Sequence, residues 1–548
     1  MSTPLARHLS ETPQSEPLPG QVPNSAGGYS FAVDDWTRFD RFLILGSEGG
    51  SYYAGERKLT IENAKVVERC VAADGVRTVA RIVEISDAGR APKNDPALLA
   101  LAIAAKHGDE PTRRAAYAAL PKVARIGTHL FHFADYVKAI GKGWGRGTTR
   151  AFARWYLDMP ADRLVLQAIK YQARDGWAHG DILRKSHPKT TDARLNAIFH
   201  WMTKGWDSIG AEPHADEVLA RIWAFERAKK LTEKTDVKEL CRLIETYQLP
   251  HECVPTEAKQ FPEVWAELLP YMGMTAMIRN LGKMTEVGLL APLSNACRVA
   301  TDQLESVDRI KRGRVHPLHV LVALKIYGQG HGDKGKLTWE PNQTIVDALD
   351  GAFYTAFKAI EPTGKNHLLA IDISGSMASA QIAGMPLTAR EASVAMALVT
   401  ANVEPNYSLM GFTAGSSPSQ WSRSHGLGSG LSTLAISARS RLDAAISYVG
   451  GLQMGGTDCA LPMVHATENK IPVDLFCVYT DSETWHGKIH PVAALRNYRQ
   501  KMGRPAKLVV IGMVASEFTI ADPEDSGSLD VVGFDTSTPA LLSDFARA

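Results

Sequence analysis

The residues best suited to chemistry lie at the end of an apolar run in the last third of the chain. Residues 368–376 read Leu-Leu-Ala-Ile-Asp-Ile-Ser-Gly-Ser, a predicted strand that ends in the carboxylate Asp372 and the hydroxyls Ser374 and Ser376. Because side chains alternate along a strand, these oxygens can point to one side as the chain leaves the sheet. Hard cations prefer oxygen ligands, and this set leaves room for water or an outside ligand. The pattern predicts a Mg²⁺ site.

Two further segments can supply oxygens to the same cation. The loop 455–458, Gly-Gly-Thr-Asp, carries the Thr457 hydroxyl, and the mostly apolar run 473–481 ends in the carboxylate of Asp481. Ligands of open parallel sheets bind outside the carboxyl ends of the strands, where Asp372, Thr457 and Asp481 would meet. The alternative is an empty site, or strand-end turns without a metal, because Ser and Asp are also common in ordinary turns.

The segments around this motif predict a doubly wound α/β domain. Continuous apolar runs are typical of parallel strands that are covered on both faces. The expected strands are 367–373, 407–412, 475–480, 507–514 and 529–534, and helices are expected at 390–403 and 440–450. This order resembles the von Willebrand factor A domain, whose metal-ion-dependent adhesion site uses Asp-x-Ser-x-Ser, a distant Thr and a distant Asp. The resemblance implies that the metal binds an acidic ligand from a partner, without catalysis.

The remaining chain predicts a tail and a long helical region. With 548 residues the chain is too long for one core, so two or more domains are expected. Residues 1–20 are rich in Pro and polar residues, which predicts a disordered tail without a signal peptide. Residues 21–360 contain one helical pattern after another, without an exact repeat, which predicts a degenerate HEAT-like α-solenoid followed by the α/β domain at 361–548. An irregular helical domain that merely positions the α/β module is the alternative.

The apolar runs and the cysteines indicate in which cellular compartment the protein is expected. The longest strongly apolar run, 98–105, is far too short to cross a bilayer, so no membrane span is expected. Six cysteines are dispersed without a Cys-x-x-Cys pair, which fits a reducing cytoplasm.

A basic cluster interrupts an otherwise balanced charge distribution. The whole chain has a net charge of only +2, but between Lys138 and Lys189 eleven lysines and arginines face four aspartates. Aromatic and histidine side chains are interleaved with them: Trp144, Tyr171, Trp177, His179 and His187. Positive charge beside stacking surfaces is what single strands and RNA loops require, so RNA is the expected ligand. A solvated helix face with core aromatic residues is the alternative.

Several short segments are typical of one known family. They include Gly143-Trp-Gly-Arg146, Arg174-Asp-Gly-Trp177, Val315-His-Pro-Leu-His319, Gly330-His-Gly332 and Gly455 to Cys459. Through them the chain resembles, over nearly everything after the tail, the Ro autoantigen family, whose members join a TROVE domain to a von Willebrand factor A domain. The resemblance implies a ring of HEAT-like repeats closed by the A domain. Family members bind Y RNAs on the outer surface and pass the single-stranded 3′ ends of misfolded non-coding RNAs through a basic hole, in RNA quality control.

The resemblance also implies site residues and partners. It assigns RNA binding to Lys142, Arg146, Lys170, Arg174, His179, Lys185 and His187, and metal binding to Asp372, Ser374, Ser376, Thr457 and Asp481. We expect a monomeric, non-enzymatic scaffold, and a Y RNA that tethers a 3′-to-5′ exoribonuclease.

Two other functions stay open at this point. One is a Mg²⁺-dependent adhesion or chaperone-type module that uses its helices as a spacer. The weaker one is a metal-assisted nuclease, because Asp372 and Asp481 provide carboxylates for one metal where phosphodiester cleavage usually uses two.

Overall fold

Two compact units make up the chain. The fold is given by a computed structural model that describes residues 12–46, 56–141, 143–209, 216–332, 335–357, 360–382, 385–414, 430–452 and 455–548. One unit, called the α/β unit, combines residues up to Val66 with Arg90–Lys93 and Phe357–Ala548. The other, called the helical unit, consists of Val67–Gly89 and Asn94–Ala356. The predicted boundary near residue 360 lies close to this division, but the N-terminal residues group with the C-terminal part of the chain.

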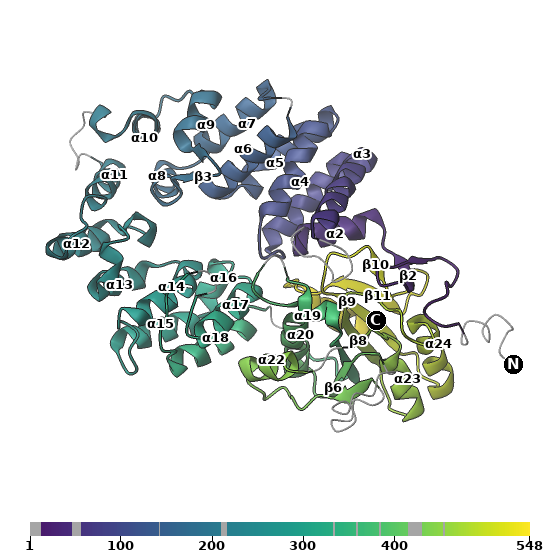
Figure 1. The fold of residues 1–548 in the computed structure, drawn as a ribbon. Helices are drawn as coiled ribbons and strands as arrows, with labels where there is room; N and C mark the ends of the chain where they lie inside the picture. The colour runs from purple at the N-terminus through teal and green to yellow at the C-terminus, as the bar shows by residue number, and fades with distance from the viewer. Residues whose placement is uncertain are drawn as a thin grey trace. The chain divides into compact units, whose positions relative to one another are not determined.

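A six-stranded sheet forms the centre of the α/β unit (Figure 1). Its strand order is β11-β9-β8-β5-β6-β7. The strands are β5 (His367–Asp372), β6 (Tyr407–Phe412), β7 (Leu431–Thr433), β8 (Leu475–Thr480), β9 (Lys507–Gly512) and β11 (Ser528–Val532). All neighbours run parallel except β6 and β7, which pair antiparallel. Every residue of β5 and β8 is buried, which explains their continuous apolar sequences.

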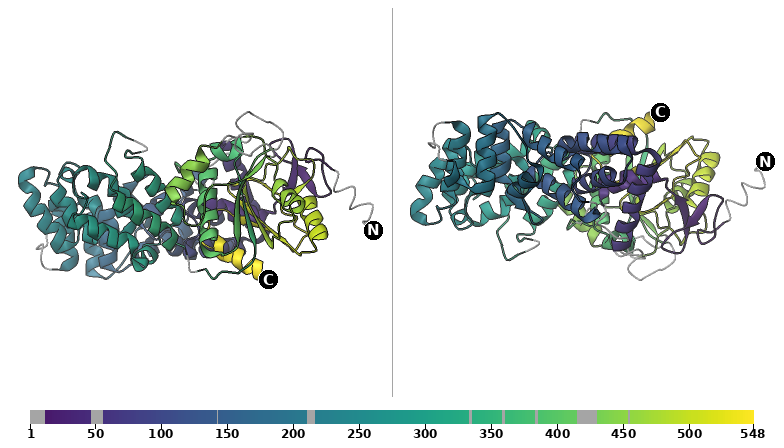
Figure 2. Two further views of the ribbon diagram at one scale, coloured as in Figure 1. Left: turned by 90° about the horizontal axis from the view of Figure 1, so that it is seen from below. Right: turned by 90° about the horizontal axis from the view of Figure 1, so that it is seen from above.

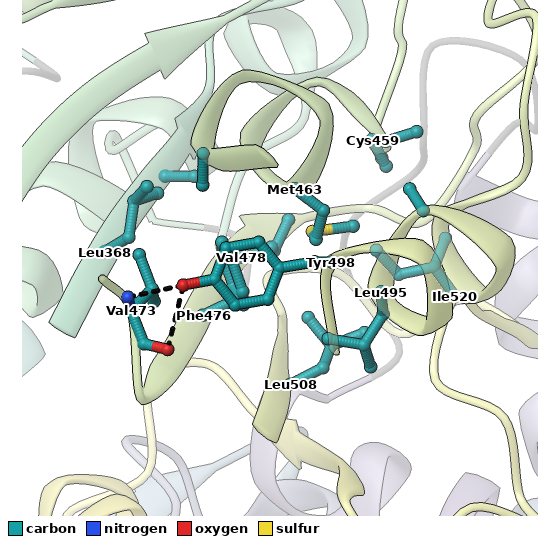
Figure 3. Close-up of a cluster of buried hydrophobic side chains, with 14 of the residues drawn as sticks. Leu368, Cys459, Met463, Val473, Phe476, Val478, Leu495, Tyr498, Leu508 and Ile520 are labelled. Carbon is teal, nitrogen blue, oxygen red and sulfur yellow. Dashed lines mark hydrogen bonds between the residues drawn. The ribbon is translucent and has the colours of Figure 1, made fainter. Parts of the chain in front are cut away.

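Helices cover both faces of this sheet (Figure 2). They are α19 (Gly375–Ser379), α20 (Ala389–Val403), α22 (Leu442–Gly450), α23 (Leu461–Glu468), α24 (Pro491–Met502) and α25 (Thr538–Arg547). Helix α20 packs on β5 and on α22. The core that includes α23 and α24 is shown in Figure 3, where Tyr498 packs edge-on against Phe476 and its hydroxyl bonds to the backbone of Val473. This phenol is buried with its polar atom satisfied.

The N-terminal residues form part of the α/β unit. Strands β1 (Gln21–Pro23) and β2 (Tyr29–Ala32) form a hairpin, and β2 also pairs with β10 (Phe518–Thr519). Leu18 and Phe31 pack against Val492 in a small apolar cluster. The prediction of a disordered tail over residues 1–20 is therefore wrong for residues 12–20, whereas residues 1–11 lie outside the described part. Local composition did not reveal that partners for these side chains lie in the C-terminal half.

Helix α2 (Asp35–Leu45) fastens this segment to the sheet. Arg41 is 1% exposed, and its guanidinium donates to both carboxylate oxygens of Asp530 at 2.7 Å. The same side chain also donates to the Ser516 and Phe518 carbonyls. A buried guanidinium with this many acceptors ties α2 to β11 and to the loop before β10.

The helical unit is built from consecutive helices that pack on their near neighbours. The helices are α3 (Glu56–Ala88), whose residues from Val67 belong to this unit, α4 (Asp95–His107), α5 (Glu110–Val123), α6 (Gly127–Ile140), α7 (Arg146–Leu157), α8 (Ala161–Lys170), α9 (His179–Ser186), α10 (Ala193–Lys204), α11 (Glu217–Ala228), α12 (Val237–Tyr247), α13 (Pro262–Leu268), α14 (Met274–Glu286), α15 (Asn295–Glu305), α16 (Val307–Arg312), α17 (Pro317–Gly328) and α18 (Gln343–Thr355). Such local packing is typical of an α-solenoid, as predicted.

Side-chain caps and one long-range contact organise this unit. Asp109, Asp192 and Asn342 accept backbone N–H groups at the starts of α5, α10 and α18, which satisfies donors that a helix cannot pair internally. Before α17, Arg314 donates to Asp87 near the end of α3, so an early and a late part of the unit are in contact. None of the helices in the described ranges has both the length and the hydropathy needed to span a bilayer.

Candidate functional site

The segments that carry the five predicted metal ligands meet in the α/β unit, where the Gly375 N–H donates to the Gly455 carbonyl of the loop with Thr457. Asp372 is the last residue of β5, and Asp481 directly follows the neighbouring parallel strand β8. The adjacent strand on the other side of β5 is β6, so the chain connections diverge between β5 and β8, the place where such sheets bind ligands. All five side chains belong to residues that are at most 1% exposed: Asp372, Ser374, Ser376, Thr457 and Asp481.

Hydrogen bonds hold the first carboxylate and the two serines. Asp372 accepts the Ser374 N–H at 2.9 Å on one oxygen and the Thr480 hydroxyl at 2.7 Å on the other. The Ser374 and Ser376 hydroxyls lie 3.0 Å apart. Ser374 is also the N-cap residue of the short helix α19, so Ser376 lies in its first turn. The Asp-x-Ser-x-Ser motif therefore turns back on itself and gathers its three side chains.

Two oxygens at this site have no hydrogen-bond partner among the described residues: Thr457 Oγ1 and Asp481 Oδ2. Burial raises the pKa of Asp372 to about 7, and the negative charge of Asp481 acts in the same direction. Burial also raises the pKa of Asp481, against the effect of the nearby Ser376 hydroxyl. Two buried carboxyl groups beside a buried unpaired hydroxyl are costly unless a positive charge joins them.

This donor set fits a hard divalent cation. All five side chains offer oxygen, and two of the oxygens are buried and unpaired, which is the chemistry that Mg²⁺ selects. Burial lowers the pKa of Arg390, against the negative charge of Asp372, and the Arg390 guanidinium donates to the carbonyls of Ile373, Gly450 and Leu452. Arg390 therefore braces the backbone around the site.

A β-hairpin positions the basic cluster of the helical unit. The apolar spacing of residues 164–173 predicts one helix, whereas in the structure α8 ends at Lys170, and β3 (Ala173–Arg174) pairs with β4 (Trp177–Ala178). The two turn residues, Asp175 and Gly176, have φ values of 53° and 74°. An Asp-Gly pair favours such a two-residue turn, so the sequence did contain the signal for this hairpin.

Stacked aromatic rings join the elements of this cluster. The rings of Trp144 and Trp177 stack with centroids 5.6 Å apart, and Trp144 also stacks on Phe152 at 4.4 Å. Lys138 Nζ lies 5.9 Å from the centre of the Trp177 ring, and Lys185 Nζ lies 5.6 Å from that of Trp144. Trp177 is buried whereas Trp144 is half-buried, so the stack continues from the core to the surface. We call Lys138, Trp144, Trp177 and Lys185 the lysine–tryptophan stack.

The predicted RNA-binding residues differ in exposure and in whether their charges already form ion pairs. Arg146, Arg174, Lys185 and His187 are exposed. Lys170 lies 3.5 Å from Glu252, and Arg174 lies 3.6 Å from Asp175. No ion pair involves Lys138, Arg146 or Lys185 in the part of the chain that the structure describes. The cations that are most available to an outside phosphate are thus those around the stack.

Two predicted residues do not contribute an exposed side chain. His179 is 3% exposed, its Nδ1 lies 2.9 Å from the Tyr156 hydroxyl, and its ring packs edge-on against Phe131. Burial lowers the pKa of His179 to about 4, so it is a neutral core residue and its ring is not exposed to an RNA ligand. Its place at the start of α9 turns its side chain inward. Lys142 lies outside the described residues.

Sequence reasoning assigned no site role to Lys138 or to the stacking of Trp144 on Trp177. The sequence identifies both tryptophans only as interleaved aromatic residues, because their stacking depends on the turn between β3 and β4, which follows the helix predicted for residues 164–173. Recognition of the Asp-Gly turn would have brought Trp177 back toward α6.

Comparisons with known proteins agree with this two-part arrangement. The TROVE domain family model matches residues 22–326, and the Ro60 vWA domain model matches residues 366–546. A Deinococcus radiodurans protein named RNA-binding protein RO60 is 42% identical over 539 residues, which cover 98% of this chain and 97% of that protein. A Caenorhabditis elegans protein of the same name is 34% identical over 598 residues, covering 96% and 90%.

A solved structure has the same fold. The crystal structure of the Deinococcus radiodurans RO (RSR) protein matches with a TM-score of 0.69 and 41% identity, over 94% of this chain and 99% of that one. The predicted fold class and the resemblance noted in the sequence are confirmed. The chain belongs to the Ro60 family of proteins that join a TROVE domain to a von Willebrand factor A domain.

Proposed function

We propose that this protein is a non-enzymatic RNA-binding scaffold that binds Y RNA and the single-stranded 3′ ends of misfolded non-coding RNAs in the cytoplasm. The observation that carries the proposal is the lysine–tryptophan stack with the exposed Arg146, Arg174 and His187 around it. The relatives that are 42% and 34% identical carry the name RNA-binding protein. The kinds of RNA in this proposal come from the resemblance to the Ro family. The stack provides the positive charges and aromatic rings that would bind them.

Phosphate contacts would provide most of the affinity. Lys138 and Lys185 would keep their ammonium groups near the RNA backbone, because the tryptophan faces beneath them favour a cation at that position. Half-buried Trp144 offers an edge on which an unpaired base could rest. Lys170 and Arg174, already near carboxylates, would exchange those partners for phosphates. Such binding would depend on RNA shape and free ends more than on base sequence.

Charge reversal tests this assignment. The double variant Lys170→Glu/Arg174→Glu should weaken Y RNA binding in filter-binding assays and reduce the slope of log K against log salt by about one per lost contact. Lys230→Glu, an exposed position beyond α11 in the same unit, is the matched control and should leave both quantities unchanged. Equal affinity and slope in the double variant and wild type would refute the assignment.

For the α/β unit we propose that Asp372, Ser374, Ser376, Thr457 and Asp481 hold Mg²⁺. The support is the pair of buried oxygens of Thr457 and Asp481 that have no hydrogen-bond partner among the residues described. Bound Mg²⁺ would neutralise the two carboxylates and accept an additional oxygen ligand from an acidic partner. The second candidate function follows from this site, namely Mg²⁺-dependent adhesion or chaperone-type binding of an acidic protein, with the helices as a spacer.

One pair of variants separates the two functions. If Asp372→Asn abolishes the main cellular interaction while Lys170→Glu/Arg174→Glu does not, the adhesion function is correct. The reverse result supports the RNA scaffold. Crosslinking in cells and sequencing of the bound RNA would identify the RNA partners directly.

Exonuclease recruitment and absence of catalysis belong to the same proposal. A 3′-to-5′ exoribonuclease tethered by Y RNA should co-purify with the protein and be lost after ribonuclease treatment. Purified protein with Mg²⁺ should leave RNA uncut, and cleavage that Asp372→Asn abolishes would instead favour the nuclease.

A further inference from the structure

The N-terminal segment, residues 12–32, contacts both loops that carry the unpaired oxygens of the candidate cation site. One loop, 455–460, carries Thr457, and the other, 481–490, begins with Asp481. The segment is separated from these loops by more than 400 positions in the sequence, yet lies against them within the α/β unit. We infer that residues of this segment set the geometry of the cation site.

Gln14 is the central contact. It is 0% exposed, and its Nε2 donates to Asp458 Oδ1 at 2.8 Å and to the Ile489 carbonyl at 2.8 Å. Its Oε1 accepts the Thr484 hydroxyl, and its backbone N–H donates to the Gly487 carbonyl at 2.9 Å. One amide side chain thus bridges the residue next to Thr457 and a residue three positions after Asp481.

The loops 455–460 and 481–490 are also hydrogen-bonded directly to each other, next to Gln14. The backbone N–H groups of Trp485 and His486 both donate to the Thr457 carbonyl at 3.2 Å. The Thr484 hydroxyl accepts the Cys459 N–H at 3.1 Å. Because Thr484 Oγ1 bonds to both Cys459 and Gln14, removal of the Gln14 amide would free this hydroxyl to turn and would loosen one loop from the other.

Two further side chains of the segment hold the second loop. Asn24 Nδ2 donates to the Thr484 carbonyl at 2.7 Å, and the Ser30 hydroxyl donates to the Ser482 carbonyl at 2.9 Å. Contact is close: a Cβ at Gly28 would lie 2.1 Å from the Thr484 carbonyl oxygen, so only glycine fits there. Ser482 itself has φ of 64°, an uncommon conformation that the surrounding contacts must maintain.

Residues from a distant part of the chain therefore hold the two loops that carry Thr457 and Asp481. Outer residues that orient metal ligands typically change metal affinity by about 10-fold to 100-fold when they are replaced. Gln14 touches no ligand oxygen itself, so it is a positioning residue. This inference rests on the cation site proposed above, because without a bound cation the segment would only stabilise the fold.

The test is cation affinity in the full-length protein. Mg²⁺ titration calorimetry and Mn²⁺ electron paramagnetic resonance would compare wild type with Gln14→Met, which keeps the side-chain volume and removes its hydrogen bonds. We expect about 10-fold weaker cation binding in Gln14→Met. The matched control is Leu18→Ala, which weakens packing of the same segment on Val492 without touching either loop, and should bind the cation within about 2-fold of wild type.

A second measurement separates positioning from general stability. If Gln14 acts through Thr484, then Gln14→Met should weaken cation binding in the wild-type background but add little to a Thr484→Val variant. Equal cation affinity in Gln14→Met and wild type, or an equal loss in Leu18→Ala, would overturn the inference. Absence of cation binding in the wild type would refute the cation site itself, and that result is distinguishable because it appears before any variant is compared.

Discussion

The two candidate sites handle charge in opposite ways. At the candidate cation site of the α/β unit, Asp372 and Asp481 have no exposed surface, and elsewhere in that unit Arg41 is 1% exposed. The helical unit exposes Lys185 and Arg174 beside aromatic rings. A buried charge must be paired inside the protein or by a bound ion, whereas an exposed charge is available to a partner and is screened by salt. The two sites should therefore respond to different perturbations.

A polar group without a partner means different things when it is buried and when it is exposed. Thr457 and Asp481 each have a buried oxygen without a hydrogen bond in the part of the chain that the structure describes, which costs free energy in the unbound protein. An exposed lysine without an ion pair costs nothing, because water solvates it. Only the first kind of observation indicates a specific ligand, and the second gains weight from the tryptophan faces beneath Lys138 and Lys185.

The largest expected effect is the loss of stability when a buried ion pair is broken. Arg41→Ala removes the guanidinium donor from Asp530 and from the Ser516 carbonyl, so the α/β unit should lose about 3–5 kcal/mol of stability. Urea unfolding followed by hydrogen exchange in β9 and β11 would measure the loss. Arg441→Ala, an exposed pair with Asp443, is the control and should change stability by less than about 0.5 kcal/mol. Similar losses in both variants would contradict the contrast between buried and exposed charge.

The next largest effect is the loss of RNA affinity when exposed lysines are reversed in charge. Reversal of Lys138 and Lys185 together should weaken RNA binding by about 100-fold in low salt, and less in high salt, because counterion release provides much of the affinity. Filter binding at several salt concentrations would measure it. Thermal stability should stay near that of wild type, since neither lysine has an ion pair in the described structure. A loss of affinity that does not depend on salt would indicate disrupted packing of the tryptophans.

A third prediction uses the buried histidine of the helical unit. The pKa of His179 is lowered to about 4 from 6.5, so the unfolded chain binds this proton more readily than the folded one. The resulting stability is present above pH 6.5 and is lost as pH falls toward 4, by about 2 kcal/mol between pH 7.5 and 5. His179→Gln should remove this part of the pH dependence in urea unfolding.

Another buried histidine gives the internal control for that experiment. Burial lowers the pKa of His129 to about 3, and the charge of Arg125 adds to the shift. Acid should therefore still destabilise the His179→Gln variant through His129, with a smaller slope than in wild type. An unchanged slope would show that the His179 ring has access to water in solution.

The smallest effect is the stabilisation by a cation. At a Mg²⁺ concentration ten times its Kd, the α/β unit should gain about 1.4 kcal/mol. Differential scanning fluorimetry would record a higher midpoint for wild type but not for Asp372→Asn. RNA affinity should be equal in the two proteins, because Asp372 belongs to the other unit. An equal Mg²⁺ shift in Asp372→Asn would show that the cation binds elsewhere.

Sequence patterns predicted the sheet, and they identified the candidate ligand residues at its edge, because both depend on short-range regularities. Strands β5 and β8 are wholly buried, so their apolar runs are continuous, and three of the five ligands lie within five positions. Interactions between distant segments were not predictable in this way. Gln14 is polar and lies among prolines, and nothing nearby indicates that Asp458, 444 positions away, is its partner.

Histidine 179 illustrates the same limit inside the helical unit. Its neighbours in sequence, Lys185 and Arg174, are exposed, but at the start of α9 its own side chain packs among Tyr156 and Phe131. Composition places such a residue in a basic cluster, and only the helix register decides whether it faces water or the core.

The position of the N-terminal segment has a consequence for biosynthesis. Residues 12–46 leave the ribosome more than 300 positions before β5, and the whole helical unit is made in between. The helical unit can fold as soon as it emerges, whereas the first hairpin must wait for Ser482 and Thr484. The segments of the proposed cation site therefore meet only when translation is nearly finished, and nascent chains that stall before residue 480 would leave Gln14 and Phe31 open to chaperones.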